Sequence, residues 1–367
     1  MAESRIIMLT HEFAPKKGGI AVYTEEMARA ATAQGHTVEV WVPDHPRLRD
    51  EDFPFRLKRL PIKGSQDWSC RIQLARALKG VSFKNCTLYL PEPGPIATWM
   101  YLQLIQKMDA QKLVLTLHGS EILKFSVRAY RKALFQKLIN RADTVSVVSH
   151  FCKDLVSENF NTSKTRLAVT PGALRHNFSI VPKKVAHAGA LRLLTVGRIH
   201  PRKGQLSVVE SLAQLPHSVR TNIEYQIAGP TVDGSYRKKI EILAQKHQLD
   251  IRFLGIIDDD SLPQRYAEAD VFALTSMPHH RSIEGYGLVY LEAGACGLPS
   301  IAHNLGGVGE AVRDGETGLL ADPYERKSLT EKILQLSQSP ELRKKLGTAA
   351  QKRAREYTWD DHARTLF

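Results

Sequence analysis

Residues 282–302 read SIEGYGLVYLEAGACGLPSIA, and this stretch indicates a buried helix that begins in a glycine-rich loop and leads into a strand. We expect the helix to begin near Gly287, where its free N–H groups and positive dipole end would attract an anion. Glu284 precedes this point, and Glu292 follows among apolar and small neighbours. A buried carboxylate is costly unless it is paired, and the hydroxyls of a ribose would pair with Glu292. The alternatives are a structural partner for Glu292 and an ordinary loop position for Glu284.

A basic loop lies about ninety residues upstream, in RLLTVGRIHPRKG at residues 192–204. The strand ends at Gly197, and Arg198 and Lys203 follow before the next helix. Ligands of open α/β sheets bind beyond the carboxyl ends of strands, where these two cations would meet a phosphate. The alternative is a basic surface loop. After the later strand Pro299–Ala302, Gly306-Gly307 can line the same ligand or form only a tight turn.

The first half repeats this arrangement. A strand at Arg5–Leu9 leads into Gly18-Gly19 and a helix, and His118 directly follows the strand KLVLTL. Glycines let the backbone approach a phosphate or sugar, although the spacing is not the G-x-G-x-x-G of a dinucleotide fold. A histidine at a strand's carboxyl end is well placed for a ligand site. The alternative is that local backbone groups satisfy its ring.

Short, nearly continuous apolar runs alternate with helical stretches such as Val22–Gln34 and Gln205–Gln214, which predicts parallel strands buried on both faces. Gly35 sits where a helix C-cap glycine belongs. The predicted strands are Arg5–Leu9, Thr37–Val42, Thr87–Leu90, Lys112–Leu117, Thr144–Val148, Leu167–Thr170, Arg192–Val196, Glu224–Ala228, Ile251–Leu254, Val271–Leu274 and Pro299–Ala302.

The pattern starts twice, on either side of a Pro-, Gly- and Lys-rich segment at residues 171–190. We therefore expect an α/β protein of two Rossmann-like, doubly wound domains that face each other across a cleft. The expected domains are residues 1–178 and residues 179–355.

Composition narrows the class of protein. The 367 residues are 43% hydrophobic and 24% charged, as in globular proteins. The four cysteines are scattered, which fits a reducing compartment, and we find no spanning segment or signal peptide. We expect a cytoplasmic protein, either free or held peripherally at the inner face of the membrane.

Together these motifs resemble the family-4 glycosyltransferases, which have the GT-B architecture, over nearly the whole chain. The resemblance implies hexose transfer from a nucleotide-diphosphate sugar, with retention at the anomeric carbon and without a cofactor. It implies that residues 1–178 lie on the acceptor side, that residues 179–355 bind the nucleotide sugar, and that residues 356–367 form a final helix that packs back on the first domain. It further implies that Arg198 and Lys203 bind the leaving diphosphate. It also implies that Glu284 contacts sugar hydroxyls, that Glu292 holds the ribose, and that His118 completes the site. The other implied donor-binding residues are Gly18, Gly19, Gly197, Phe253, Gly255, Ile256, Gly285, Tyr286, Gly287 and Leu288.

Several alternatives stay open. The donor is GDP-mannose, UDP-glucose or UDP-N-acetylglucosamine. A nucleotide-sugar epimerase on the same fold and a non-catalytic sugar-nucleotide binder compete with the transferase. Asp258 and Asp260 form a D-x-D, the pattern that holds a metal in another class of sugar transferase. We interpret them as acids that cap a helix at Leu262–Ala269 and complement its dipole, and we expect no metal. His279, His280 and Arg281 have no assigned role.

The uneven distribution of charged residues along the chain suggests what kind of acceptor the protein binds. Residues 1–180 carry 26 Lys and Arg against 16 Asp and Glu, whereas the rest of the chain is nearly balanced. Residues 122–142 contain six bases and no acid, with Val127, Tyr130, Leu134, Leu138 and Ala142 at helical spacing. We predict one amphipathic segment whose apolar face packs on the sheet. Its bases would meet an anionic or lipid-linked acceptor, or an anionic membrane, in cell-envelope polysaccharide or glycolipid synthesis. No nucleic-acid partner is expected, and solvated bases are the alternative.

Overall fold

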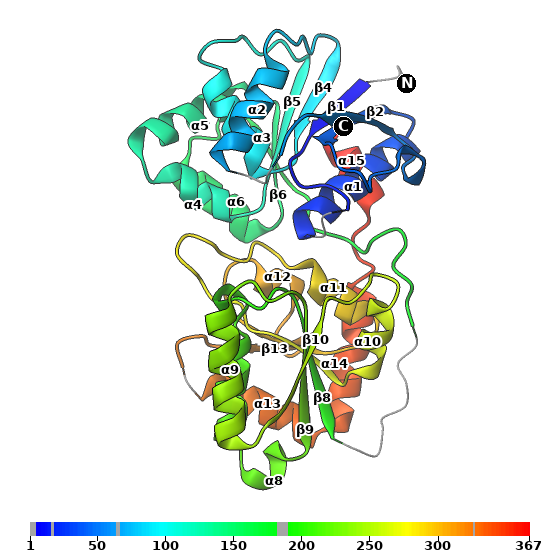
Figure 1. Ribbon diagram of the computed structural model, residues 1–367, viewed down its shortest axis with the longest axis vertical. Coiled ribbons are helices and arrows are strands. Elements are labelled where there is room, and N and C mark those ends of the chain that lie inside the picture. The colour runs from blue at the N-terminus through cyan, green and yellow to red at the C-terminus, as the bar shows by residue number, and fades with distance from the viewer. Residues whose placement is uncertain (1–4, 16–17, 64–66, 182–189, 326) are drawn as a thin grey trace. The chain divides into compact units, whose positions relative to one another are not determined.

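The computed structural model describes residues 5–15, 18–63, 67–181, 190–325 and 327–367. The chain forms two compact units, each with its own parallel sheet flanked by helices (Figure 1). The first unit contains the chain up to Arg175 together with Tyr357–Phe367, and the second contains His176–Glu356.

The first unit has a seven-stranded sheet in the order β3-β2-β1-β4-β5-β6-β7, with every neighbouring pair parallel. Its central strands are buried on both faces because their residues are almost all apolar. The strands are β1 (Arg5–Leu9), β2 (Thr37–Pro43), β3 (Arg56–Leu60), β4 (Cys86–Leu90), β5 (Lys112–Leu117), β6 (Thr144–Val147) and β7 (Arg166–Val169). The helices are α1 (Gly19–Ala33), η1 (Asp50–Asp52), α2 (Trp68–Leu78), α3 (Pro93–Leu102), α4 (Ser120–Ser126), α5 (Ala129–Arg141), α6 (His150–Asn159) and α15 (Trp359–Leu366).

The final helix α15 belongs to the first unit and packs against α1 (Figure 1). The Trp359 indole donates to the Leu174 carbonyl at 2.8 Å, and its ring lies 5.1 Å from that of Tyr23. Lys112 Nζ donates to the Leu366 carbonyl at 2.8 Å, which satisfies a helix-terminal acceptor. These contacts join the end of the chain to the first sheet.

The second unit has a six-stranded parallel sheet in the order β10-β9-β8-β11-β12-β13. The strands are β8 (Leu191–Val196), β9 (Ile223–Ala228), β10 (Asp250–Gly255), β11 (Val271–Leu274), β12 (Ser300–His303) and β13 (Gly318–Ala321). The helices are η2 (Pro201–Lys203), α7 (Gln205–Gln214), α8 (His217–Arg220), α9 (Gly234–His247), α10 (Leu262–Glu268), α11 (Leu288–Ala295), α12 (Val308–Ala311), α13 (Ser328–Gln338) and α14 (Pro340–Arg353). None of the helices in the described part of the chain has the length and apolar character needed to span a bilayer.

The predicted doubly wound α/β class is confirmed, and each predicted strand is present to within one residue at either end. Gly35 adopts a φ of 87° just beyond α1, as a C-cap glycine does. Two edge strands were not predicted. The sequence of β3, RLKRL, mixes leucines with bases because a face of this edge strand is exposed, and β13 has only four residues.

The amphipathic segment predicted over residues 122–142 is confirmed only in part: Leu138 and Ala142 are buried, but the segment is interrupted. The chain leaves α4 at Val127 and begins α5 at Ala129, so two short helices replace it. Phe135, Leu138 and Ile139 form the buried face of α5, whereas Val127 and Tyr130 are 46% and 50% exposed. Two apolar residues expected against the sheet therefore face solvent.

Candidate active site

The basic loop after β8 is built by three local features. His200 caps η2, since its Nδ1 accepts a hydrogen bond from the Arg202 N–H at 3.1 Å, and Pro201 supplies the first helical φ. Gly204 closes the turn in the left-handed region, with φ 71°. The loop thus presents Arg202 and Lys203 from a single rigid turn.

Gly204 also brings this loop against the chain that follows β11. A Cβ at position 204 would lie 1.8 Å from the Thr275 carbonyl oxygen, so that only glycine fits. The Thr275 hydroxyl donates to the Gly204 carbonyl at 2.7 Å, and the Met277 N–H donates to the Arg202 carbonyl at 2.9 Å. Segments more than seventy residues apart are therefore joined at backbone level.

Glu284 is positioned by the Gly306-Gly307 turn. The Gly307 N–H donates to the Glu284 carbonyl at 3.1 Å, and a Cβ on Gly306 would lie 2.3 Å from the same oxygen. As predicted, the turn follows β12 and precedes a short helix, α12. The sequence suggested that the turn could line a ligand; here it supports the backbone of Glu284.

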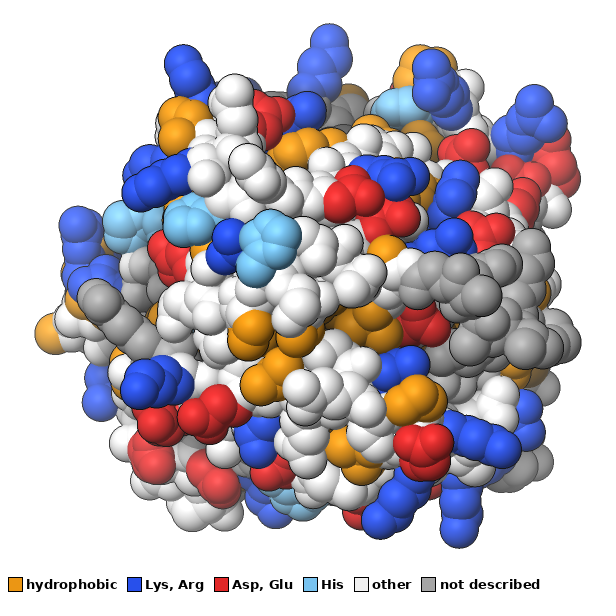
Figure 2. All heavy atoms as spheres, turned by 90° about the horizontal axis from the view of Figure 1, so that it is seen from below, with side chains coloured by type: hydrophobic (Ala, Val, Ile, Leu, Met, Phe, Trp, Pro, Cys, Tyr) orange, Lys and Arg blue, Asp and Glu red, His pale blue; other side chains and the backbone are white. Residues whose placement is uncertain are grey.

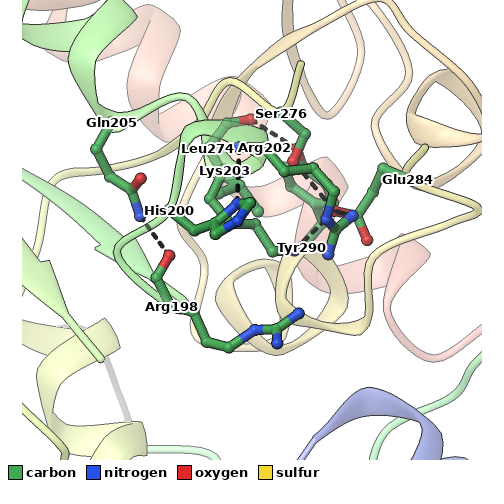
Figure 3. A network of polar contacts seen from close by, with 9 residues as sticks. All are labelled: Arg198, His200, Arg202, Lys203, Gln205, Leu274, Ser276, Glu284 and Tyr290. Carbon is green, nitrogen blue, oxygen red and sulfur yellow. Dashed lines mark hydrogen bonds and ion pairs between the residues drawn. The ribbon is translucent and has the colours of Figure 1, made fainter. Parts of the chain in front are cut away.

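The Glu284 carboxylate is the centre of a polar network (Figure 3). Its Oε2 lies 2.7 Å from Lys203 Nζ and 3.0 Å from Arg202 Nη1, and it accepts a hydrogen bond from the Ser276 hydroxyl at 3.1 Å. The side chains of Glu284, Lys203 and Arg202 are only about 15% exposed. The structure therefore brings together two predicted site residues, Lys203 and Glu284, and adds two that were not predicted.

Burial alone would raise the pKa of Glu284, but the charges of Lys203 and Arg202 lower it to about 2. Burial lowers the pKa of Lys203 despite the opposing effect of Glu284. The pair therefore contributes less to stability than the Glu284 shift alone indicates. Glu284 is therefore ionised at neutral pH, and its carboxylate holds the side chains of Lys203 and Arg202.

This shift predicts a pH dependence of stability. A carboxylate whose folded pKa is depressed stabilises the fold above its ordinary pKa of 4.5, and this contribution is lost as the pH falls toward about 2. Glu284→Gln should cost up to about 3 kcal/mol at neutral pH and progressively less below 4.5. Urea unfolding of the wild type and of Glu284→Gln between pH 6 and pH 3 measures this loss of unfolding free energy. Glu210→Gln, at an exposed position, is the control. A cost that does not change with pH would contradict the charge assignment.

Arg198 lies apart from this network (Figure 3). Its side chain is exposed, and its carbonyl accepts a hydrogen bond from Gln205 Nε2 at 2.9 Å. Among the described residues, no ion pair to its guanidinium is found. The structure thus separates the two cations that the sequence grouped: Lys203 is paired, and Arg198 is available to an added anion.

The helix α11 begins as predicted, with Gly287 at its N-cap in a φ of 101°. Gly285 and Tyr286 are buried before it, and Leu288 is its first residue. Glu292 is 8% exposed and accepts a hydrogen bond from the Tyr266 hydroxyl at 3.0 Å. This tyrosine, 26 residues upstream, is a partner that sequence reasoning missed, because only the fold brings α10 beside α11.

Three residues predicted to bind the donor, Phe253, Gly255 and Ile256, belong to the end of β10 or follow it directly. Gly255 has φ 67°, and its carbonyl accepts a hydrogen bond from the Gly229 N–H at 2.7 Å. The Arg237 guanidinium lies 4.3 Å from the centre of the Phe253 ring, while Ile256 is 71% exposed. These residues lie at the edge of the sheet, because β10 is an edge strand.

The remaining predicted site residues belong to the first unit. Gly18 caps α1 in an extended conformation and Gly19 is its first residue, both exposed. His118 follows β5 as predicted; its Nε2 lies 2.8 Å from the Pro91 carbonyl, and its N–H donates to Glu121. The backbone thus satisfies one ring nitrogen, which matches the structural alternative for this histidine, and its place in the site stays a prediction.

Asp258 and Asp260 are exposed and precede α10, whose N-cap, Ser261, makes no side-chain hydrogen bond. The prediction that acids cap this helix with their side chains is therefore not supported. The described residues contain no cluster of three or more histidine, cysteine or acidic side chains placed to hold a metal. His279 and His280 stack edge to face at 4.4 Å, and His279 lies 4.9 Å from His200 beside the basic loop.

Comparison with known proteins matches both halves of the chain. A family model described as "Glycosyl transferases group 1" matches residues 179–353, and one described as "Glycosyltransferase Family 4" matches residues 17–177. The chain is 26% identical over 359 residues to a GDP-mannose-dependent alpha-(1-6)-phosphatidylinositol monomannoside mannosyltransferase of Mycolicibacterium smegmatis, covering 94% of this chain and 92% of that protein.

Solved structures match over almost the full length. Sucrose-phosphate synthase from Thermosynechococcus elongatus gives a TM-score of 0.81 at 23% identity, covering 99% of this chain and 97% of that one. Anabaena HepE in complex with UDP and glucose gives 0.76 at 19% identity, covering 99% and 98%. Together with the two parallel sheets, these similarities confirm the predicted two-domain GT-B fold.

Proposed function

Because the chain belongs to the family-4 glycosyltransferases, we propose that it moves a hexose from a nucleotide-diphosphate sugar to an acceptor in glycolipid or cell-envelope polysaccharide synthesis, with retention of anomeric configuration. The observation that carries this proposal is the network in which Glu284 holds Lys203 and Arg202 beside exposed Arg198. This network follows the carboxyl end of β8, where open α/β sheets bind ligands.

The proposed chemistry needs only charge stabilisation. When the bond between the anomeric carbon and the diphosphate breaks, negative charge develops on the leaving phosphate. Fixed cations and a helix N-terminus stabilise that charge because they are oriented before the reaction. In this mechanism Lys203 and Arg198 face the diphosphate, the N-terminus of α11 lies near it, and Glu284 holds Lys203 in place while accepting hydrogen bonds from the sugar.

Retention is the finer part of the proposal. Among the described residues, no carboxylate has been identified that is placed to act as a nucleophile on the sugar. We therefore expect the acceptor to attack from the side of the leaving group, which preserves the anomeric configuration. Proton NMR of the first-formed product, before any anomeric exchange, distinguishes retention from inversion.

GDP-mannose is the donor that we expect first, because the Mycolicibacterium relative is named for it, and UDP-glucose is the main alternative. A thermal-shift screen of GDP, UDP and their sugars tests the donor, since a ligand that binds only the folded state raises the apparent stability. Released nucleoside diphosphate then tests turnover. A protein that binds a donor but never releases the diphosphate in the presence of lipid acceptors would be a binder and not a transferase.

We expect turnover to survive chelation of divalent metals. The proposed cations supply the positive charge that Mg²⁺ or Mn²⁺ supplies elsewhere. Asp258 and Asp260, the residues with a metal-binding spacing, lie before α10 and outside the Glu284 network. Rates measured with and without EDTA should agree within about twofold. Loss of activity that manganese restores would show that these acids, or others, hold a metal.

A further inference from the structure

Large apolar side chains gather on the surface of the first unit, over helices α2, α3 and α5. They lie on α2, just beyond the end of α3, and between α4 and α5. The exposed members are Trp68 (54%), Ile72 (48%), Leu104 (58%), Ile105 (81%), Val127 (46%) and Tyr130 (50%). We call them, with Arg71, Arg128, Arg131 and Lys132, the apolar–basic surface.

Contacts among the three helices make this surface continuous. α3 packs against both α2 and α5, and Figure 1 shows the three in neighbouring positions. The Trp68 and Tyr101 rings are 5.6 Å apart, which links α2 to α3. Gln103 Nε2 donates to the Leu134 carbonyl at 2.9 Å, which links the end of α3 to α5.

The bases of this surface lie beside its aromatic rings. The Arg71 guanidinium is 5.4 Å from the Trp68 ring centre, and that of Arg131 is 5.9 Å from the Tyr130 ring centre. Hydrogen bonds from Arg128 and Arg131 lower the pKa of Tyr130. Burial, and next the positive charge of Arg131, lower the pKa of Arg71, so bases from two helices repel each other here.

Acids are few around this surface: Asp67 caps α2 and interacts with Arg71, and Glu121 of α4 is buried. Residues 68–80, 93–108 and 122–142 contain no Asp or Glu. By contrast, Figure 2 shows a face of the molecule, seen from below, on which acidic and basic side chains are interspersed. This excess of positive charge favours an anionic partner.

The exposed apolar side chains decide which anionic partner fits. Nucleic acid and acidic proteins match the bases, but they give no reason for Leu104 and Ile105 to protrude into water. A bilayer interface accepts aliphatic and tryptophan side chains at the headgroup boundary, while its anionic lipids attract Arg and Lys. We propose that the apolar–basic surface docks on an anionic lipid bilayer, with Trp68, Leu104 and Ile105 entering the interface. This goes beyond the proposed function and does not depend on the donor.

Sedimentation with vesicles tests the docking without any donor or acceptor. The protein should bind vesicles in which about a third of the lipid is phosphatidylglycerol and the rest phosphatidylcholine. It should not bind vesicles of phosphatidylcholine alone. Binding should weaken between about 0.1 M and about 1 M salt as the Debye length falls from about 10 to about 3 Å. Reversing Arg128, Arg131 and Lys132 to Glu should weaken binding roughly a hundredfold or more, at about 1 kcal/mol for each base removed.

The apolar contribution has its own variant and its own signal. The double variant Leu104→Ser with Ile105→Ser should bind vesicles at least tenfold more weakly than the wild type. Its binding should stay weak at low salt, because the lost contribution is apolar. Trp68 is 54% exposed whereas the other three tryptophans are buried, so a blue shift of fluorescence on vesicle binding should come from Trp68. Trp68→Phe should remove the shift while keeping most of the binding.

Matched changes on α9 of the second unit, Lys238→Glu, Lys239→Glu and Ile242→Ser, should leave vesicle binding unchanged, since these residues are also exposed. Thermal shifts with nucleotides should be the same for all variants, which separates docking from the proposed reaction. Equal or negligible sedimentation with both lipids would overturn the proposal. The proposal would also be overturned if the protein did not bind vesicles but associated with itself, and if the Leu104 and Ile105 substitutions abolished that self-association. The surface would then bind a second copy of the chain.

Discussion

Lys203→Ala should lower the turnover number by roughly a hundredfold or more, the scale seen when one preorganised electrostatic partner of a transition state is removed. Lys203 Nζ lies 2.7 Å from Glu284 Oε2 in a side-chain network that is only about 15% exposed. The low exposure strengthens its attraction to a diphosphate, because less water screens the charge. Initial rates at saturating donor give the effect, with exposed Lys238→Ala on α9 as the control.

The pairing of Lys203 complicates this experiment, because the alanine variant also leaves Glu284 with Arg202 alone. Arg198→Ala provides the cleaner variant, since its guanidinium is exposed and makes no ion pair among the described residues. We expect the same loss of turnover with an unchanged melting temperature. Near-wild-type turnover in both variants would remove these cations from the mechanism.

The sequence was sufficient for the parts of the fold that depend on local pattern. Strands such as β5 and β11 are continuous apolar runs, and their bounds were predicted without error. The turn before α11 was predicted because Gly285 and Gly287 precede an apolar helix that contains a single acid. Edge strand β3 was missed because its partly exposed face gives it the composition of a basic loop.

The ion pairs of the candidate site were beyond this kind of reasoning. Lys203 and Glu284 are 81 residues apart, and they meet because Gly204 lies against Thr275 and Gly306 lies against the Glu284 backbone. Sequence pattern marked these glycines as turns without showing what each one contacts. Arg202 had a signal, since it stands beside Lys203 in HPRKG, but a run of bases does not tell which member is paired.

The break between α4 and α5 at Val127 was also beyond what sequence pattern predicts. Val127, Tyr130, Leu134, Leu138 and Ala142 fit a single helical face by spacing, and Leu138 and Ala142 are indeed buried. The chain turns between α4 and α5, however, and α5 buries Phe135 and Ile139 while Val127 and Tyr130 are exposed. Periodicity predicts that an apolar face exists and does not fix where a helix stops.

Glu292→Ala should weaken the binding of the nucleoside diphosphate at least tenfold. A hydroxyl that donates to an ionised carboxylate contributes about 1.5–3 kcal/mol, and a ribose offers two such hydroxyls. Glu292 sits on α11, within eight residues of the predicted sugar contact at Glu284, and Tyr266 already donates to its Oε2 at 3.0 Å. Isothermal titration calorimetry with GDP and UDP gives the affinities.

The Tyr266 contact supplies the control that separates a ribose partner from a structural acid. If Glu292 only anchors Tyr266, then Tyr266→Phe and Glu292→Ala should lower the melting temperature alike and leave nucleotide affinity intact. If Glu292 binds ribose, the wild type should bind the nucleoside diphosphate more tightly than its 2′-deoxy counterpart. The Tyr266→Phe variant should keep that preference, whereas the Glu292→Ala variant should lose it. The loss of binding free energy caused by Glu292→Ala and the loss caused by removing the 2′-hydroxyl should then not add up when the two are combined. Losses are additive for groups that do not touch, so this deviation measures the contact between the carboxylate and the hydroxyl. An undiminished preference in Glu292→Ala would place the ribose elsewhere and leave this carboxylate a structural role.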